Sequence, residues 1–507
     1  MSEITTINVC MLLLLMMIMM TCLSHGAGES HEETAAEGSS IEDPAAAGWI
    51  TAAGDDVEWA REPVRTTPSL TEEDAAAGEQ SSANGVQSSS SEESCPNDCD
   101  CFNRYETVDC SRRGLETLPL LHNDTRRLYL EDNRLVSLDT GLRDAAQLTL
   151  LIVERNYLER VDVDESLCGL TRIQELNLAA NRIRSFNVGG STRSADSPCR
   201  APALKELNLS LNLLTVVPQN LSEFAPNLEI LNLSYNEIAS ATLDETYAAM
   251  TSLRYLDLSR NRIHYVVNDD FGAVTGTGVP LEILSLVECG LVQIDDGALA
   301  DFVNLTSLGL ANNPLQQDTL TAALGRIGRR RPGNRSHCLQ SAASGVDVEE
   351  YISESSCPSS DAQLVRLDIS EVILTNLTLE ALGGFSRLVV LDASYCELKY
   401  VDPHLFDCLP DLETLHLEGG RLERLENLPA LRRLRRLHLQ ENRLTIAVDL
   451  HGLDALESVD LSRNRIETIP THWLSGTRGL QIVNLSHNLI TAIEPDAFNQ
   501  VELLTTQ

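Results

Sequence analysis

The sequence predicts an α/β solenoid, in which about 14 short repeats stack their strands into one parallel, concave sheet. The first observation is self-similarity, because the template LxxLxLxxNxL recurs from Thr125 to Leu480, mostly at intervals of 22 to 28 residues. The second is composition: 43% of the residues are apolar and only 4% are aromatic, so aliphatic side chains must fill the core. The third is that no apolar run after the first 26 residues approaches the length of a spanning helix.

Residues 1–26 are expected to be a secretory signal peptide. Val9 to Leu23 form an apolar run that is short for a spanning helix, and Ser24 and Gly26 are small residues suited to cleavage. The stretch before this run departs from the pattern, because it holds Glu3 and neither Lys nor Arg. An uncleaved anchor is the alternative. The mature chain is expected to be secreted, or to lie at the cell surface only if a partner or a longer transcript anchors it.

Residues 27–94 have a different composition, rich in Ala, Ser, Glu and Gly. They hold 16 acidic residues against two basic ones, Arg61 and Arg65. No hydrophobic period is visible, so burial cannot offset the entropy of ordering, and we expect a disordered acidic tail. The tail is either a solvated spacer or an acidic, O-glycosylated segment that binds a basic partner.

Each repeat copy is expected to form one strand, with the two Leu of its LxL core pointing inward. The Asn at position nine of the template is polar because its side chain satisfies backbone groups where the chain turns. Cys289 and Cys396 replace it as small buried thiols. The clearest copies begin at Ile173, Leu204, Leu228, Leu253, Leu281, Leu305, Leu388, Leu434, Leu456 and Leu480, and weaker ones at Thr125, Leu148, Leu364 and Leu412.

These repeats resemble those of the leucine-rich repeat superfamily, and the resemblance covers about residues 95–500. It implies a horseshoe with a parallel concave sheet. The segment 95–124 contains C-x3-C-x-C-x8-C and resembles the cysteine-rich N-terminal cap of secreted and cell-surface members. The resemblance implies the pairs Cys95–Cys101 and Cys99–Cys110, although the sequence alone leaves three connectivities. A zinc site made by the same four cysteines is the alternative, and the secretory leader argues against it.

The repeats are expected in two blocks, residues 125–315 and 364–500. Between them, residues 316–363 are expected to form an inserted loop closed by a Cys338–Cys357 disulfide. The loop carries Arg326 and the run 329–331, which is exposed loop sequence, a processing site or a basic docking patch. Residues 501–507 end without a cap, which predicts either a truncated chain or an exposed apolar end that forms a homo- or hetero-dimer.

The remaining cysteines and the glycosylation sequons follow the repeat positions. Cys168 and Cys199 each lie five residues before a copy, so stacking would bring them within disulfide range, with two buried thiols as the alternative. Cys289, Cys396 and Cys408 are expected to be free. The Asn-x-Ser/Thr sequons are Asn123, Asn208, Asn220, Asn232, Asn304, Asn334, Asn376 and Asn484.

The sequence favours a protein-binding function without catalysis. It has no phosphate-binding Gly loop, no GxSxG and no HExxH, so we expect no enzyme, cofactor or resident metal. The formal charge of −37 argues against nucleic acid and anionic membrane as partners. The leading hypothesis is an extracellular recognition module that binds a protein ligand on its concave surface, of adhesion or receptor type. The alternatives are a soluble innate immune protein that binds microbial or immune-complex partners, and a matrix component that self-associates.

One candidate contact patch combines apolar and aromatic residues at concave positions of the fifth to seventh copies. It comprises Ile230, Tyr235, Tyr255, Ile283 and Val287. Ordinary scattered surface apolarity is the alternative.

A second candidate is the row at position five in the later copies. It reads Asp368, Asp392, His416, His438 and Asp460. Stacked strands would place the two His side by side with carboxylates flanking them. The row is a solvated polar ladder, a weak divalent-metal site or a pH-sensitive contact, and the pH-sensitive reading rests on His416, His438, Asp392 and Asp460.

Overall fold

The computed structural model describes residues 95–498, apart from 97–98, 139–141, 143–144, 190–198, 276–277, 329–356 and 359. The chain divides into two units between Ser89 and Ser90, and every described residue belongs to the second unit. The expected signal peptide at 1–26, the acidic tail at 27–94 and the chain end at 501–507 lie outside the described residues.

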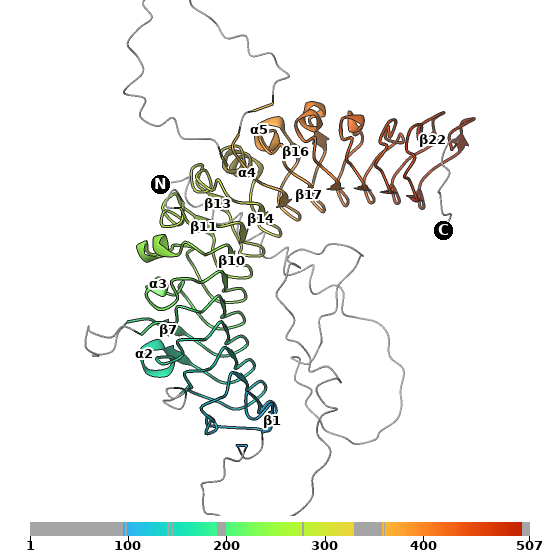
Figure 1. Ribbon diagram of the computed structural model, residues 1–507. Helices are drawn as coiled ribbons and strands as arrows, with labels where there is room; N and C mark the ends of the chain where they lie inside the picture. The colour runs from blue at the N-terminus through green and yellow to red at the C-terminus, as the bar shows by residue number, and fades with distance from the viewer. Residues whose placement is uncertain are drawn as a thin grey trace, which may run out of the picture. The chain divides into compact units, whose positions relative to one another are not determined.

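One 16-stranded sheet runs through the second unit, and each repeat copy supplies one of its strands (Figure 1). The first pair, β1 with β2, is antiparallel, and from β2 onward the neighbours are parallel. This confirms the predicted solenoid with a parallel sheet. In sheet order the strands are β1 (Asp100–Phe102), β2 (Thr107–Asp109), β3 (Arg127–Tyr129), β4 (Leu150–Ile152), β6 (Glu175–Asn177), β8 (Glu206–Asn208), β9 (Ile230–Asn232), β10 (Tyr255–Asp257), β12 (Ile283–Ser285), β14 (Ser307–Gly309), β15 (Arg366–Asp368), β17 (Val390–Asp392), β19 (Thr414–His416), β20 (Arg436–His438), β21 (Ser458–Asp460) and β23 (Ile482–Asn484).

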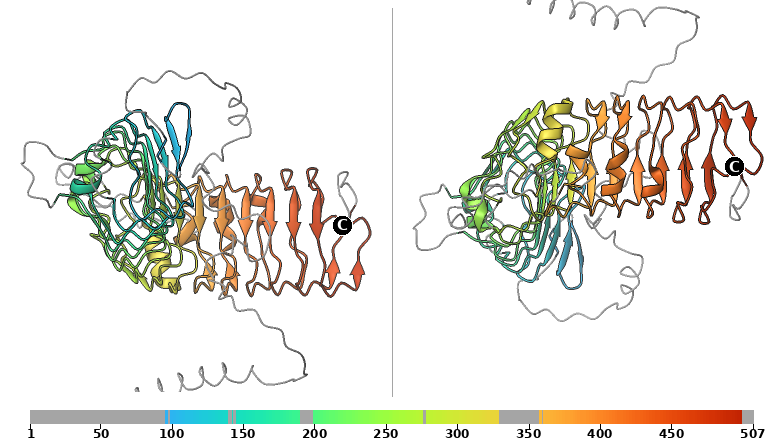
Figure 2. Two further views of the ribbon diagram at one scale, coloured as in Figure 1. Left: turned by 90° about the horizontal axis from the view of Figure 1, so that it is seen from below. Right: turned by 90° about the horizontal axis from the view of Figure 1, so that it is seen from above.

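Short helices and strand pairs close most turns on the side away from this sheet, and Figure 2 shows successive turns lying parallel to one another. The helices are α2 (Val163–Ser166), α3 (Leu221–Phe224), α4 (Gln317–Leu324) and α5 (Leu379–Leu382), with 3-10 helices η3 (Glu245–Ala249), η4 (Pro403–Cys408) and η5 (Leu428–Ala430). The parallel strand pairs are β5 (Arg160–Asp162) with β7 (Ser185–Asn187), β11 (Tyr265–Val266) with β13 (Gln293–Ile294), β16 (Asn376–Leu377) with β18 (Tyr400–Val401), and β22 (Thr468–Ile469) with β24 (Ala492–Ile493).

The leucines of the template fill one continuous core. Leu253, Leu256 and Leu258 of a single copy are all 0% exposed, while Tyr255 and Asp257 between them are only half-buried. This alternation is what a strand of period two requires when only one of its faces is buried. Each fully buried Leu contributes roughly 1.5–3 kcal/mol relative to exposure, so the repetition itself supplies the stability.

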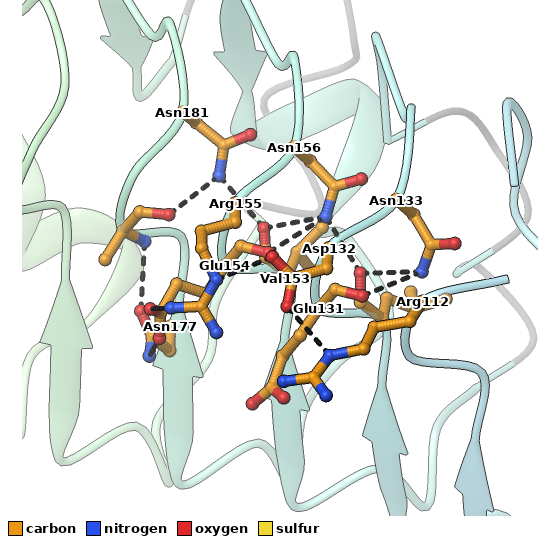
Figure 3. A network of polar contacts seen from close by, with 12 residues as sticks. Arg112, Glu131, Asp132, Asn133, Val153, Glu154, Arg155, Asn156, Asn177 and Asn181 are labelled. Carbon is orange, nitrogen blue, oxygen red and sulfur yellow. Dashed lines mark hydrogen bonds and ion pairs between the residues drawn. The ribbon is translucent and has the colours of Figure 1, made fainter. Parts of the chain in front are cut away.

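The asparagine at position nine holds adjacent turns together, as Figure 3 shows for Asn133, Asn156 and Asn181. Asn156 Nδ2 donates to Leu130 O in the preceding turn at 2.8 Å, and Asn156 Oδ1 accepts from Leu135 N at 3.0 Å. Both groups are buried, so an apolar residue would leave them unpaired. This confirms the role expected from the sequence.

The two cysteines at position nine are buried and free, as expected. Cys289 Sγ donates to Leu258 O at 3.1 Å, and Cys396 Sγ donates to Ile369 O at 3.3 Å. Each thiol therefore replaces one of the donor contacts that Asn makes across the turn.

Position eight adopts a left-handed backbone in copy after copy, a feature that the sequence did not reveal. The backbone φ lies between 52° and 55° at Arg155, Tyr235, Arg260 and Glu288. Such values normally favour Gly or Asn. The turn aligns these side chains along the edge of the sheet, where Asp132 bridges Arg112 at 3.3 Å and Arg155 at 2.7 Å (Figure 3).

The N-terminal cap contains the disulfides Cys95–Cys101 and Cys99–Cys110, the pairing that the resemblance implied. The thiols are thereby consumed, which removes the zinc alternative for these four cysteines. The structure also joins Cys168 to Cys199, with the Cα atoms 5.2 Å apart.

The segment 316–363 does not split the solenoid into two blocks, contrary to our expectation. Strand β14 pairs directly with β15, with Leu308 opposite Leu367. Residues 317–324 form α4, whose Gln317 Oε1 accepts hydrogen bonds from Thr375 N and Asn376 N, both at 3.0 Å. The first part of the segment is therefore a turn of the solenoid.

The expected Cys338–Cys357 disulfide is wrong for Cys357, which pairs with Cys408 instead. Cys338 lies outside the described residues. A Cβ on Gly383 would lie 2.8 Å from Pro358 Cδ, so the chain passes over the end of α5 as it returns. This path brings Cys357 to the end of η4, with its Cα 5.5 Å from that of Cys408. The expectation that Cys408 is free is wrong for the same reason.

Candidate protein-binding face

The outward side chains of the parallel strands form regular rows. We call the surface made by positions three, five and seven of the copies the sheet face. Residues in the same template position lie directly opposite one another in successive strands, as Tyr255 does between Ile230 and Ile283. The stacking therefore turns a one-dimensional repeat into a surface on which side chains from sequence-distant strands are neighbours.

Ile230, Tyr255 and Ile283 form three consecutive members of the position-three row. All three are half-buried, and the row continues into the polar residues Glu206 on one side and Ser307 on the other. The Tyr255 hydroxyl donates to Asp257 Oδ2 at 3.3 Å, and burial raises the pKa of Tyr255, so the phenol stays neutral. An aromatic ring between two branched aliphatic side chains, with polar residues around them, is a composition typical of binding hot spots.

Two other residues of the expected patch lie outside this row. Val287 is at position seven, where its Cγ2 lies 3.0 Å from the point that a Cβ on Gly309 would occupy. Tyr235 is at position eight, beyond the end of β9, and Arg260 Cζ lies 4.6 Å above its ring. Arg260 in turn pairs with Glu288 at 2.7 Å, so Tyr235 belongs to the edge of the sheet.

The position-five row brings Asp392, His416, His438 and Asp460 together in the predicted order. The two imidazole rings are stacked, with centroids 4.3 Å apart and planes at 8°. His416 Nδ1 lies 3.3 Å from Glu418 Oε1, and both side chains are buried.

The environment moves the pKa values of these groups apart. Burial lowers the pKa of His416, but the Glu418 hydrogen bond and the Asp392 carboxylate outweigh it, so the pKa lies above its ordinary value. Burial and the facing His416 place the pKa of His438 below its ordinary value. Burial and the neighbouring Asp392 raise the pKa of Asp368 to about 7. The row can therefore change charge near neutral pH.

Two buried oxygen atoms beside the His pair have no hydrogen-bond partner among the described residues. They are Glu418 Oε2 and Gln440 Oε1, whose residues follow His416 and His438 by two positions, just beyond the ends of β19 and β20. A buried acceptor without a hydrogen-bond partner costs folding free energy. The repeated Leu and Asn of the template do not require these two unpaired oxygens.

The sequons fall into distinct environments. Asn123 and Asn304 are exposed, Asn220 and Asn376 are half-buried, and Asn334 lies outside the described residues. Asn208, Asn232 and Asn484 are half-buried at position five of the sheet face. Asn484 Nδ2 also donates to Asp460 Oδ2 at 2.9 Å. A glycan on any of these last three would cover the sheet face.

The described residues contain one group of three or more His, Cys, Asp or Glu donors close enough to share a metal ion: Asp164, Cys168 and Cys199. Both sulfur atoms belong to a disulfide, so they offer no thiolate ligand. The His416–His438 row is not such a group, which weighs against the weak metal site considered from the sequence.

A pocket of about 620 Å³, not expected from the sequence, lies at the edge of the sheet face, on the turns that follow β19 to β23. Its lining residues are Gly420, Glu441, Asn442, Arg443, Arg463, Asn464, Arg465 and His487. The signal in the sequence was the Arg that occupies position ten in three consecutive copies, at Arg421, Arg443 and Arg465.

Within the part of the chain that the structure describes, no helix combines the length and apolarity needed to cross a membrane.

The comparisons with known proteins agree with the observed architecture. A family model described as leucine rich repeat matches residues 202–263, 362–422 and 454–506. Podocan-like protein 1 of Mus musculus is 28% identical over 488 residues, covering 82% of this chain and 83% of its own. Lumican of Coturnix japonica is 26% identical over 226 residues, covering 44% of this chain and 60% of lumican. These relatives are extracellular proteins built from the same repeat.

A solved structure shows the same fold. The LRR protein LIC12759 of Leptospira interrogans superposes with a TM-score of 0.54 at 21% identity, covering 78% of this chain and 94% of that one. At this identity the likeness concerns the fold alone.

Proposed function

We propose that this chain, which belongs to the leucine-rich repeat proteins, is a secreted, non-enzymatic module that binds a protein ligand on its sheet face. The observation that carries the proposal is the register that places Tyr255 between Ile230 and Ile283. The four disulfides among the described residues fit an oxidising, extracellular compartment, as do the extracellular relatives.

The proposal is tested by comparing two double variants of the secreted protein in the same capture experiment. Tyr255→Ala with Ile283→Ser removes the centre of the patch. Tyr265→Ala with Val292→Ser is the matched control, because both residues are exposed apolar side chains that lie outside the sheet face. Captured extracellular proteins are quantified by mass spectrometry. We expect the captured amount of at least one protein to fall about ten-fold with the first variant and to stay unchanged with the control, as expected for truncation of a hot spot. Identical recovery with both variants would exclude this patch as the site.

A matrix role through self-association is a second candidate, and the similarity to lumican and to podocan-like protein 1 over long stretches of the chain favours it. Sedimentation velocity over a range of protein concentrations tests it. Self-association predicts a sedimentation coefficient that rises with concentration, and a constant monomer value contradicts it. The innate immune alternative has no observation here in its favour and stays a hypothesis from the sequence.

A further inference from the structure

The pocket at the edge of the sheet face carries positive charge in a strongly acidic protein. Among its lining residues, Arg443, Arg463 and Arg465 face a single carboxylate, that of Glu441. Glu441 pairs with Arg463 at 2.5 Å, so the one acidic group of the pocket is already engaged. The side chains of Arg443 and Arg465 make no hydrogen bond or ion pair with any other described residue.

Three other arginines in the position-ten row have partners. Arg262 pairs with Glu237 at 3.1 Å, and Arg421 pairs with Glu397 at 2.7 Å. Arg182 lies over the ring of Tyr157, with Cζ 4.5 Å from the centroid. In these three cases the residue at position ten of a neighbouring turn neutralises the cation or stacks on it.

Arg443 and Arg465 have no such partner, and they follow Arg421 at the same template position in three consecutive turns. Adjacent parallel strands are separated by about 4.8 Å, so the two guanidinium groups lie within reach of one another and of one shared ligand. Like charges directly opposite one another are destabilising. The arrangement leaves an unbalanced repulsion that a bound anion would remove.

Gly420 provides the space beside them. Most copies have Asn at this position, and a Cβ on Gly420 would lie 2.8 Å from Asn442 Oδ1. Asn442 Oδ1 is needed by the backbone, since it accepts from Leu422 N at 3.0 Å. The missing side chain thus preserves the Asn ladder and also keeps the wall of the pocket open next to Arg443.

We propose that this pocket binds a carboxylate of the partner protein, an Asp or Glu side chain held between Arg443 and Arg465. The inference rests on the proposed protein-binding function and adds the chemistry of the contact. Planar guanidinium groups match the geometry of carboxylates, with two parallel N–H donors per pair. The chain's formal charge of −37 opposes the approach of a polyanion, such as a sulfated glycan, over long distances. A single acidic side chain on an otherwise neutral or basic partner avoids that repulsion.

The first test measures anion binding without any partner, so that it does not depend on the patch at Tyr255. The melting temperature of the secreted protein is compared in sodium phosphate and in sodium chloride of equal ionic strength. The test variant is Arg443→Gln with Arg465→Gln, and the matched control is Arg424→Gln with Arg478→Gln, two exposed arginines outside the pocket. The shift in melting temperature from chloride to phosphate is expected to be about 1–3 °C larger for wild type and control than for the test variant. Equal phosphate shifts in all three proteins would overturn the proposal.

The second test identifies the source of the anion. Fluorescently labelled Gly-Glu-Gly-Glu-Gly, its Gln counterpart and a heparin tetrasaccharide are titrated by polarisation. The Glu peptide is expected to bind the test variant at least about ten-fold more weakly than the control, and the Gln peptide to bind neither. If only the heparin fragment distinguishes the variants, the ligand is a sulfated glycan and the proposed protein carboxylate is wrong.

Discussion

The asparagine at position nine provides hydrogen-bond partners for buried backbone groups of adjacent turns. Asn261 Nδ2 donates to Leu233 O at 3.0 Å and to Leu258 O at 2.8 Å, and its Oδ1 accepts from Ile238 N at 3.0 Å. Asn261→Ala leaves these buried groups unpaired and should cost about 2–4 kcal/mol of unfolding free energy. Asn261→Cys keeps one donor, as Cys289 does in the next copy, and should cost less. Urea unfolding followed by circular dichroism measures both, and equal losses would contradict the argument.

Asp368 gives a residue-scale prediction for pH. Its pKa of about 7 in the folded chain lies above the ordinary value near 4, so its favourable contribution is complete at acid pH and is lost as the pH rises through 7. Asp368→Asn keeps an acceptor for Ser370 N, which now donates to Oδ1 at 3.0 Å. The variant should therefore be more stable than wild type at pH 8, by at most about 4 kcal/mol, and similar at about pH 4.5. Urea midpoints at the two pH values check this, and an equal difference at both would refute it.

At the residue scale, the repeat template predicted which side chains are buried, but not the backbone conformation of the turn after each strand. The buried Leu, the Asn at position nine and the free Cys289 and Cys396 follow from the template. The left-handed φ at position eight was hidden because Tyr235, Arg260 and Glu288 are not residues that favour it. Tyr235 was consequently expected among the side chains of the strand, although it lies beyond the end of β9.

The Cys357–Cys408 disulfide is a prediction at the scale of elements, because it ties the returning chain to η4 across 51 residues of sequence. Peptide mapping without reduction should find the peptides of Cys357 and Cys408 linked. Cys408→Ser should lower stability by roughly 2–4 kcal/mol, since the loop in the unfolded chain is no longer constrained. Recovery of a linked Cys338–Cys357 peptide would contradict the structure and restore the expectation from the sequence.

The long interval between the copies at Leu305 and Leu364 did not reveal how β14, α4 and β15 connect. The sequence showed an insertion there but gave no sign that α4 completes the turn or that Gln317 bonds across to Thr375 and Asn376. Those contacts join residues nearly sixty positions apart, which no local pattern encodes. The pairing of Cys357 was missed for the same reason.

The His416–His438 pair links four strands and predicts a pH-dependent contact. His416 faces Asp392 from β17 and His438 and Arg436 from β20, with Glu418 two residues after it, and His438 faces Asp460 from β21. Because its pKa is raised and that of His438 is lowered, acidification adds one positive charge first and resists the second. For an acidic ligand, affinity should rise about three-fold or more between about pH 7.5 and 5.5.

The matched variants for this prediction are His416→Gln with His438→Gln and, as control, His404→Gln with His451→Gln, both exposed. The pH dependence of partner binding should vanish in the first and persist in the second. A dependence that survives in the first variant would exclude the pair as the sensor.

At the scale of the whole molecule, the continuous sheet determines which side chains from different repeats become neighbours. The stacking register was enough to predict from sequence that Ile230, Tyr255 and Ile283 adjoin, and that the two His lie side by side. The basic pocket was not predictable in this way, because it depends on the turns between strands and on which arginines already have a partner.

The same continuity predicts that the protein survives a cut within residues 329–356. Strands β14 and β15 pair across that segment, α4 packs against α5, and every disulfide among the described residues lies wholly on one side of it. A site for a specific protease placed after Gly345 should therefore yield two fragments that co-elute in size-exclusion chromatography under native conditions and separate in urea. Gln317→Ala removes the hydrogen bonds from Thr375 and Asn376, so it should lower the urea concentration at which the cut fragments separate. Fragments that part in native buffer would show that the two halves fold as independent blocks.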